Sequence, residues 1–294
     1  SCPVRLKISR RTAIIYIRLW LMLSKRTDSM VIDFHTHAFP DKIAPRAIKS
    51  LAEKAGGLPY YTDGTVSDTD EKMRSWGVDK RVMLSIATNS KQQHNVNSFA
   101  IAQNSAHIIA FGSVHPDAPD ALDELDRIKD AGLLGVKFHP EYQEFYIDDP
   151  KLYPIYDKCR ALGLVMSFHA GRDLGFPDSL MAPPQHSRKL IDNFPGAKIV
   201  LAHMGGAMLD DDVLTYIAGT DCYLDTSFSI HDLPKRAAEQ IIEKHGAERI
   251  LFGSDCPWER SCDSFDYIDS LSISDDKKEL IYSTNAITLL GLNK

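Results

Sequence analysis

Short apolar runs alternate with longer amphipathic segments from Met30 to the C-terminus. Each run is continuously apolar or nearly so, as expected for a strand whose two faces are both buried. The eight runs that we expect to be strands are 31–37, 81–87, 108–114, 135–138, 164–168, 198–202, 222–227 and 249–253. Between them the pattern predicts helices within 40–56 and over 67–76, 95–105, 119–131, 151–162, 187–193, 210–218, 234–245 and 275–290.

Strands that alternate with helices indicate a parallel sheet, and eight repeats indicate that the sheet closes. The expected fold is therefore α/β, a (β/α)8 TIM barrel formed by residues 30–294. An open doubly wound sheet is the alternative. No glycine-rich phosphate-binding motif follows the first strand, which argues against that alternative.

The first 29 residues differ from the rest in charge. They hold seven basic residues against Asp28 alone, a net +6, so the body from Met30 onward carries −12 of the total of −6. The run from Thr12 to Leu23 is interrupted by Arg18, is too short to span a bilayer, and has no small-residue cleavage site after it. We expect residues 1–29 to be an N-terminal extension outside the catalytic fold; a peripheral amphipathic anchor is the other interpretation.

The composition indicates the class of protein, its compartment and its partners. Of its 294 residues 44% are hydrophobic and 25% charged, as in a globular protein with a sizeable core. The acidic balance argues against nucleic acid or an anionic membrane as the partner. The five cysteines include no CxxC pair, which suits reduced thiols in the cytoplasm. The expected partner is a small-molecule substrate, with a homodimer left open.

The first strand ends in His35-Thr36-His37, and Asp33 precedes it. Because side chains alternate along a strand, His35 and His37 should lie on one face, with Asp33 one step deeper. Two neutral imidazoles on one face suit a metal ion. An isolated His-x-His is equally well explained by two hydrogen-bonded polar residues at a strand end.

Polar residues at other strand ends favour the metal site over this second explanation. His139, His169 and His203 each follow an apolar run directly, and Asp255 follows the last run after Ser254. In a parallel barrel the carboxyl ends of all strands lie on one rim, where barrel enzymes place their chemistry. The sequence therefore predicts that these side chains surround one site.

The motifs at these strand ends resemble those of one family. The sequences Asp33-Phe34-His35-Thr36-His37, Gly135-Val136-Lys137-Phe138-His139-Pro140, Phe168-His169-Ala170-Gly171, Ala202-His203-Met204-Gly205-Gly206 and Gly253-Ser254-Asp255-Cys256-Pro257-Trp258 are similar to those of the amidohydrolase superfamily. The closest likeness is to its amidohydrolase-related branch of metal-dependent hydrolases and decarboxylases. The likeness runs from Met30 to about Leu292.

This resemblance implies that His35, His37, His169 and Asp255 bind one divalent metal ion. Zinc is the expected ion, because three imidazoles and a carboxylate suit Zn²⁺ with water completing its coordination; manganese and cobalt are alternatives. Zinc lowers the pKa of bound water toward neutrality. Asp255 is then the expected general base, and His203 the residue that orients the water or polarises the substrate carbonyl. An indirect hydrogen-bonding role is the alternative for His203.

The remaining candidates concern the substrate. Binuclear members of the superfamily use a carboxylated lysine on the fourth strand, and Lys137 lies on that strand. We expect one metal, with Lys137 as a buried cation or substrate contact and His139 as a substrate contact or an extra ligand. Arg172 follows His169 by three residues and could pair with a substrate carboxylate; an ordinary surface ion pair is equally compatible.

Three functions are compatible with these residues. The leading prediction is a hydrolase that acts on a lactone, an amide or a similar carbonyl. A nonoxidative decarboxylase of an aromatic or unsaturated acid would share the same ligands. A non-catalytic metal-binding protein is disfavoured, because a structural site does not need the acid–base groups of His203 and Asp255.

Overall fold

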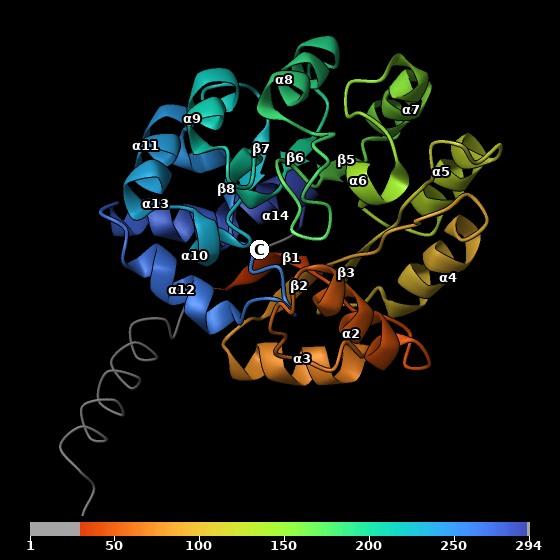
Figure 1. Ribbon diagram of the computed structural model, residues 1–294, viewed down its shortest axis with the longest axis horizontal. Coiled ribbons are helices and arrows are strands. Elements are labelled where there is room, and N and C mark those ends of the chain that lie inside the picture. Colours follow the sequence, from red (N-terminus) through yellow and green to blue (C-terminus); the bar gives the residue numbers. More distant parts are fainter. Residues whose placement is uncertain (1–29, 293–294) are drawn as a thin grey trace, which may run out of the picture. The chain divides into compact units, whose positions relative to one another are not determined.

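The computed structural model describes residues 30–292, and the prediction for residues 1–29 lies outside them. Eight strands and the helices between them alternate along the chain (Figure 1). The strands are β1 (Ile32–Thr36), β2 (Lys80–Leu84), β3 (Ile108–Phe111), β4 (Gly135–Phe138), β5 (Val165–Phe168), β6 (Ile199–Leu201), β7 (Tyr223–Asp225) and β8 (Ile250–Leu251).

The helices mostly match the predicted positions. The α-helices are α2 (Ala44–Lys54), α3 (Val66–Ser75), α4 (Gln93–Gln103), α5 (Ala121–Asp130), α6 (Pro140–Gln143), α7 (Tyr153–Leu162), α8 (Pro184–Asn193), α9 (Asp210–Asp212), α10 (Ser229–Asp232), α11 (Lys235–His245), α12 (Ser261–Asp269), α13 (Asp275–Glu279) and α14 (Asn285–Leu290). Short 3-10 turns span Pro150–Leu152, His203–Gly205 and Ala247–Arg249, and π-helical turns span Val213–Ile217 and Leu280–Thr284.

Two differences from the predicted helices have local causes. The segments predicted as single helices over 210–218 and 275–290 each contain one of the π-helical turns. Helix α12 was not predicted, because among its nine residues the fully buried side chains include two serines beside Phe265 and Ile268. The apolar signal over this helix is therefore sparse.

All neighbouring strands are parallel, in the orders β1-β2-β3 and β4-β5-β6-β7-β8. Backbone hydrogen bonds join the two groups at both seams. Gly112 bridges β3 to β4, with its carbonyl accepting from Lys137 N–H at 2.8 Å. At the other seam Phe34 N–H donates to Phe252 O at 2.7 Å, and His37 N–H donates to Cys256 O at 2.7 Å. The strands thus form the (β/α)8 TIM barrel that the alternation predicted.

The hydrophobic core lies between the strands and the surrounding helices. Side chains on the outer face of the strands, such as Met83, Phe138 and Phe168, are fully buried against the helices. The aromatic rings of Phe138, Tyr156 and Phe168 pack on one another, with ring centroids 5.0 to 5.8 Å apart. This packing fixes the strands, so the residues at their carboxyl ends are held on a rigid frame. No helix in the described part of the chain is long and apolar enough to cross a membrane.

Candidate metal centre and active site

Three of the predicted ligands meet at the rim of the barrel. Asp255 Oδ1 lies 3.3 Å from His35 Nε2 and 3.1 Å from His37 Nε2. His35 and His37 come from the end of β1, and Asp255 follows β8, the strand that completes the barrel beside β1. The backbone of Asp255 has a φ of 65°, an uncommon value for a residue with a side chain. Its N–H donates to the carbonyl of His35 at 2.8 Å, which holds this conformation.

The Nδ1 atoms of both histidines are engaged by acceptors. His35 Nδ1 lies 2.9 Å from the carboxylate of Asp225, and His37 Nδ1 lies 3.0 Å from the carbonyl oxygen of Leu84. Because neither acceptor carries a proton, each Nδ1 is the donor. Both Nε2 atoms are then unprotonated and face Asp255. This is how buried partners prepare imidazoles to bind a metal.

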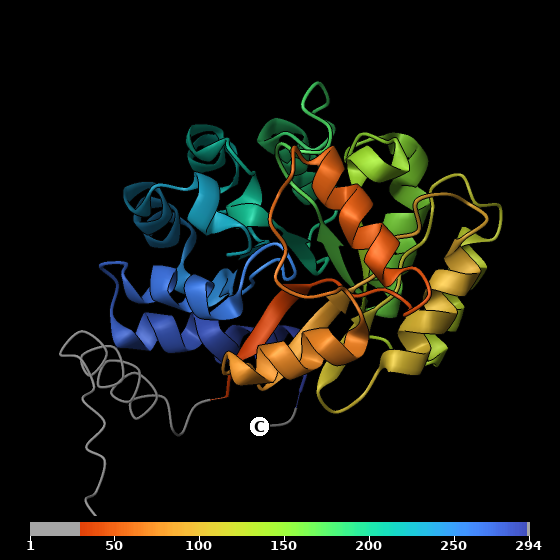
Figure 2. The ribbon, with the colours of Figure 1, turned by 60° about the horizontal axis from the view of Figure 1, so that its bottom comes forward.

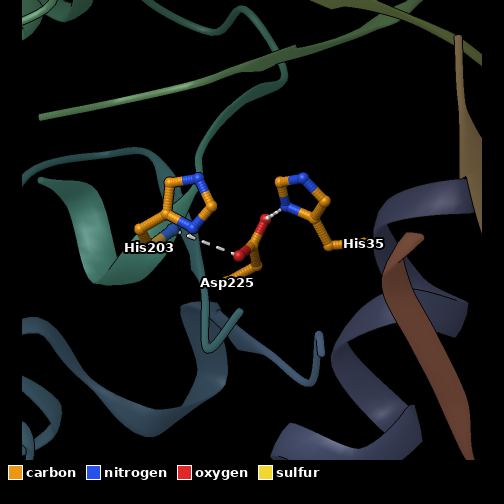
Figure 3. Close-up of side chains that lie close together, drawn as sticks. All are labelled: His35, His203 and Asp225. Carbon is orange, nitrogen blue, oxygen red and sulfur yellow. Dashed lines mark hydrogen bonds and ion pairs between the residues drawn. The ribbon is translucent and has the colours of Figure 1, made fainter. Parts of the chain in front are cut away.

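Asp225 was not among the predicted site residues. It ends β7, is fully buried, and accepts hydrogen bonds from the side chain of His35 and the backbone N–H of His203 (Figure 3). Ser227 also donates to it. Burial alone would raise the pKa of Asp225, but the neighbouring imidazoles and these donors lower it well below its usual range. The signal in the sequence was an aspartate within the predicted strand 222–227.

His169 and His203 form a chain of hydrogen bonds that leads back to Asp225. Ser227 Oγ donates to Asp225 and lies 2.9 Å from His203 Nδ1, so it accepts from that ring. His203 Nε2 then accepts from His169 Nδ1 at 3.0 Å. This leaves His169 Nε2 unprotonated, and it is a buried atom without a hydrogen-bond partner. His169 is thus prepared as a donor in the same way as His35 and His37.

The loops after β5 and β6 approach closely at Gly171. A Cβ atom at this position would lie 2.1 Å from Ala207 N, and the φ of Gly171 is 85°. Ala207 N–H donates to Ala170 O at 3.0 Å across the same contact. Only glycine permits this approach. It keeps His169 and His203 together, with ring centroids 4.8 Å apart.

The described residues therefore fit a divalent metal ion. His35, His37 and Asp255 form one group with ligand atoms within 4.8 Å of one another, and His169 supplies a further unprotonated nitrogen. Burial is the main cause that lowers the pKa of His35, to about 4, so this imidazole is neutral at pH 7. His169 also belongs to a second group, with His139 and Asp173. That His169 binds the same ion as His35 and His37 remains a prediction.

Asp33 does not lie with the histidines, so that prediction was wrong. Its carboxylate accepts from the backbone N–H of His35 at 3.1 Å and from the hydroxyls of Ser254 and Ser261 at 2.6 and 2.9 Å. The β1–β2 register shifts between Asp33 and Thr36. This irregularity breaks the regular alternation of side chains on which the prediction depended.

Lys137 projects from β4 to the same centre. Its Nζ lies 3.4 Å from His35 Nε2, and its side chain is buried. Burial lowers the pKa of Lys137 to about 8, while the charges of Asp225 and Asp255 oppose this shift. The ammonium therefore predominates at pH 7, and Lys137 is a buried cation beside the predicted metal ligands.

His139 and Asp173 form the neighbouring part of the rim. His139 Nε2 lies 3.1 Å from Asp173 Oδ2, and the ring stacks on His169 with centroids 4.3 Å apart. Nothing in the sequence pairs Asp173 with His139. Arg172 precedes it, is exposed and lines the cavity described next.

The predicted site residues line one cavity of about 610 Å³. His35, His37, Lys137, His139, His169, Arg172, His203 and Asp255 all contribute to its wall. Side chains from α2 and α4 and from the loops after the strands form the rest. A cavity of this size with a few converging polar groups is the usual form of a small-molecule site.

Comparison with known structures agrees with the barrel fold. The chain shares its fold with a 5-carboxyvanillate decarboxylase from Sphingomonas paucimobilis (18% identity, TM-score 0.65, covering 90% of this chain and 99% of that one). A dihydroxybenzoic acid decarboxylase from Polaromonas, solved with bound manganese and the inhibitor 2-nitroresorcinol, is similar (19% identity, TM-score 0.64, covering 90% of this chain and 98% of that one). A candidate 2-pyrone-4,6-dicarboxylic acid hydrolase from Pseudomonas putida is also similar (16% identity, TM-score 0.64, covering 90% of this chain and 98% of that one).

The family comparison confirms the resemblance found in the strand-end motifs. The model of the amidohydrolase family matches residues 32–292, nearly the whole of the described chain. The protein is therefore an enzyme of the amidohydrolase family.

Proposed function

We propose that this enzyme is a metal-dependent hydrolase acting on a lactone, an amide or a similar carbonyl of a small substrate that bears a carboxylate. The observation that supports this most directly is the set of donor atoms His35 Nε2, His37 Nε2 and Asp255 Oδ1, with both Nδ1 atoms held by acceptors. His169 is the fourth proposed ligand, and zinc the proposed ion.

A bound divalent ion lowers the pKa of a coordinated water and polarises a carbonyl oxygen. Asp255 accepts the proton of the attacking water. Burial opposes ionisation of Asp255, but the nearby His35 and His37 lower its pKa to about 2, so it is a carboxylate at neutral pH and able to act as a base. His203 lines the cavity and orients the water or the carbonyl. Lys137 and Arg172 are the two cations placed to bind a substrate carboxylate.

Nonoxidative decarboxylation of an aromatic or unsaturated acid is the second candidate. Two of the three structures compared above belong to decarboxylases of aromatic acids. This reaction needs a proton donor at carbon. Asp255 is ionised at neutral pH, so within this site Lys137, which is largely protonated, is better suited to that role.

The two candidates differ in product. The full chain, loaded separately with zinc and with manganese, is screened against lactones and against hydroxybenzoates, with ring-opened acid and CO2 as the readouts. The matched control is an Asp255→Asn preparation, which excludes a contaminating activity. Ring-opened acid without CO2 supports the proposal. CO2 from a hydroxybenzoate refutes it in favour of decarboxylation, and neither product from either class also refutes it.

A further inference from the structure

Helix α2 carries two apolar stripes. Ala44, Ile48 and Ala52 are buried and form the stripe that packs on the core. A second stripe, with Ile43 just before the helix, Ala47 and Leu51, lines the cavity. The two stripes are adjacent and together have the spacing of one ordinary apolar helix face. Here only half of that face packs on the core, and the other half is turned to the cavity.

Helix α4 shows the complementary arrangement. Its buried face is largely polar, because Gln93 and Asn97 lie inside the fold beside Ala100. Gln93 Nε2 donates to Asp120 at 2.7 Å, and Asn97 Nδ2 donates to Glu124 at 2.8 Å. The apolar Val96 and Phe99 are only half-buried, and both line the cavity. Specific hydrogen bonds therefore hold α4 in place with apolar side chains directed to the cavity.

Exposed apolar residues continue this surface to the mouth of the cavity. Ile43, Leu174 and Met208 are 51%, 40% and 39% exposed, and all three line the cavity. They come from three separate loops, after β1, β5 and β6. Large apolar side chains that gather around a cavity mouth indicate binding of an apolar ligand.

We propose that Ile43, Ala47, Leu51, Val96 and Phe99, here called the apolar lobe, bind an apolar substituent of the substrate that is larger than one aromatic ring. Helices α2 and α4, which carry the lobe apart from Ile43, lie on the same side of the barrel in both views (Figures 1 and 2), and both line the cavity. The cavity of about 610 Å³ is about four times the roughly 150 Å³ that accommodates benzene. The inference rests on the proposed function for the place of the reacting carbonyl, which lies at the polar end beside Lys137.

A chain-length series tests this directly. Straight-chain carboxylates from butanoate to decanoate are titrated into the metal-loaded full chain by calorimetry, with benzoate and biphenyl-carboxylate as an aromatic arm. Each added CH2 should tighten binding about fourfold, which corresponds to roughly 0.8 kcal/mol, until the lobe is filled. An equal dissociation constant for butanoate and decanoate, together with equal ones for benzoate and biphenyl-carboxylate, would overturn the inference. The arm with the steeper gain identifies the substituent as alkyl or aryl.

Variants locate the effect. Leu51→Asn and Val96→Asn, both at half-buried positions, should flatten the chain-length dependence. The matched control, Leu122→Asn, changes a 42% exposed residue of α5 outside the cavity and should preserve it. A steep dependence that Leu51→Asn and Val96→Asn leave unchanged would refute the assignment to this lobe. The series on the unaltered protein decides the size of the site even if a variant does not fold.

The two proposals can fail separately. A steep chain-length dependence in a protein that hydrolyses no lactone or amide leaves the lobe standing and refutes the hydrolase proposal. Lactone turnover in a protein whose carboxylate binding does not depend on chain length supports the hydrolase proposal and refutes the apolar lobe.

Discussion

Replacing Asp225 with asparagine should weaken metal binding without removing a ligand. Asp225 uses one carboxylate oxygen for His35 Nδ1 and the other for the backbone N–H groups of His203 and Ser227. Asparagine has a single acceptor oxygen. If that oxygen keeps the two backbone donors, the amide NH2 faces His35 Nδ1, and the imidazole must carry its proton on Nε2, the atom that faces Asp255.

The expected size of this effect follows from the role of Asp225. Loss of such an outer partner of a metal-binding histidine costs typically about 10–100-fold in metal affinity, or roughly 1.4–2.7 kcal/mol. Competition with a metal-binding dye measures the dissociation constant. The matched control is Asp221→Asn, which makes the same change of charge at a side chain that is 77% exposed. An Asp225→Asn protein that folds and binds zinc as tightly as the Asp221→Asn control would refute the reasoning.

Three further predictions concern other parts of the chain. His203→Ala should still bind metal when the ion is in excess, yet lose about 10²–10⁴-fold in turnover; a folded variant without metal would make His203 a ligand. Burial raises the pKa of Glu259 from 4.5 to about 9, so the folded state holds its proton more tightly, and the free energy of unfolding should fall as the pH rises between these values. Glu259→Gln should reduce this slope in denaturant titrations, and an unchanged slope would contradict the assignment. A chain that starts at Met30 should bind metal and turn over like the full chain, and a truncated protein that precipitates would place residues 1–29 within the fold.

The sequence was informative at most of the strand ends that form the site. Alternating apolar runs predicted eight strands, and the barrel brings their carboxyl ends to one rim. For that reason the sequence alone predicts that His35, His37 and Asp255 lie together. The same reasoning brought His139, His169 and His203 to one cavity.

The errors and omissions have a different physical origin. Asp33 was misplaced because its own carboxylate binds the N–H of His35 and disturbs the pleat, which a pattern of alternation does not reveal. Asp225 was missed because its role depends on a hydrogen bond to a residue 190 positions away. The second apolar stripe of α2 could not be told from a core stripe, since both consist of ordinary apolar residues at helical spacing.

The central claim is that His35, His37 and Asp255 hold a metal ion on which activity depends. The most direct test is the metal content per folded chain of the purified protein and of its Asp255→Ala variant, measured by elemental analysis beside the Asp221→Asn control. We predict one divalent ion per chain in the unaltered protein and in the control, and almost none in Asp255→Ala. Absence of metal from the unaltered protein, or a full complement of metal in a folded Asp255→Ala variant, would contradict it.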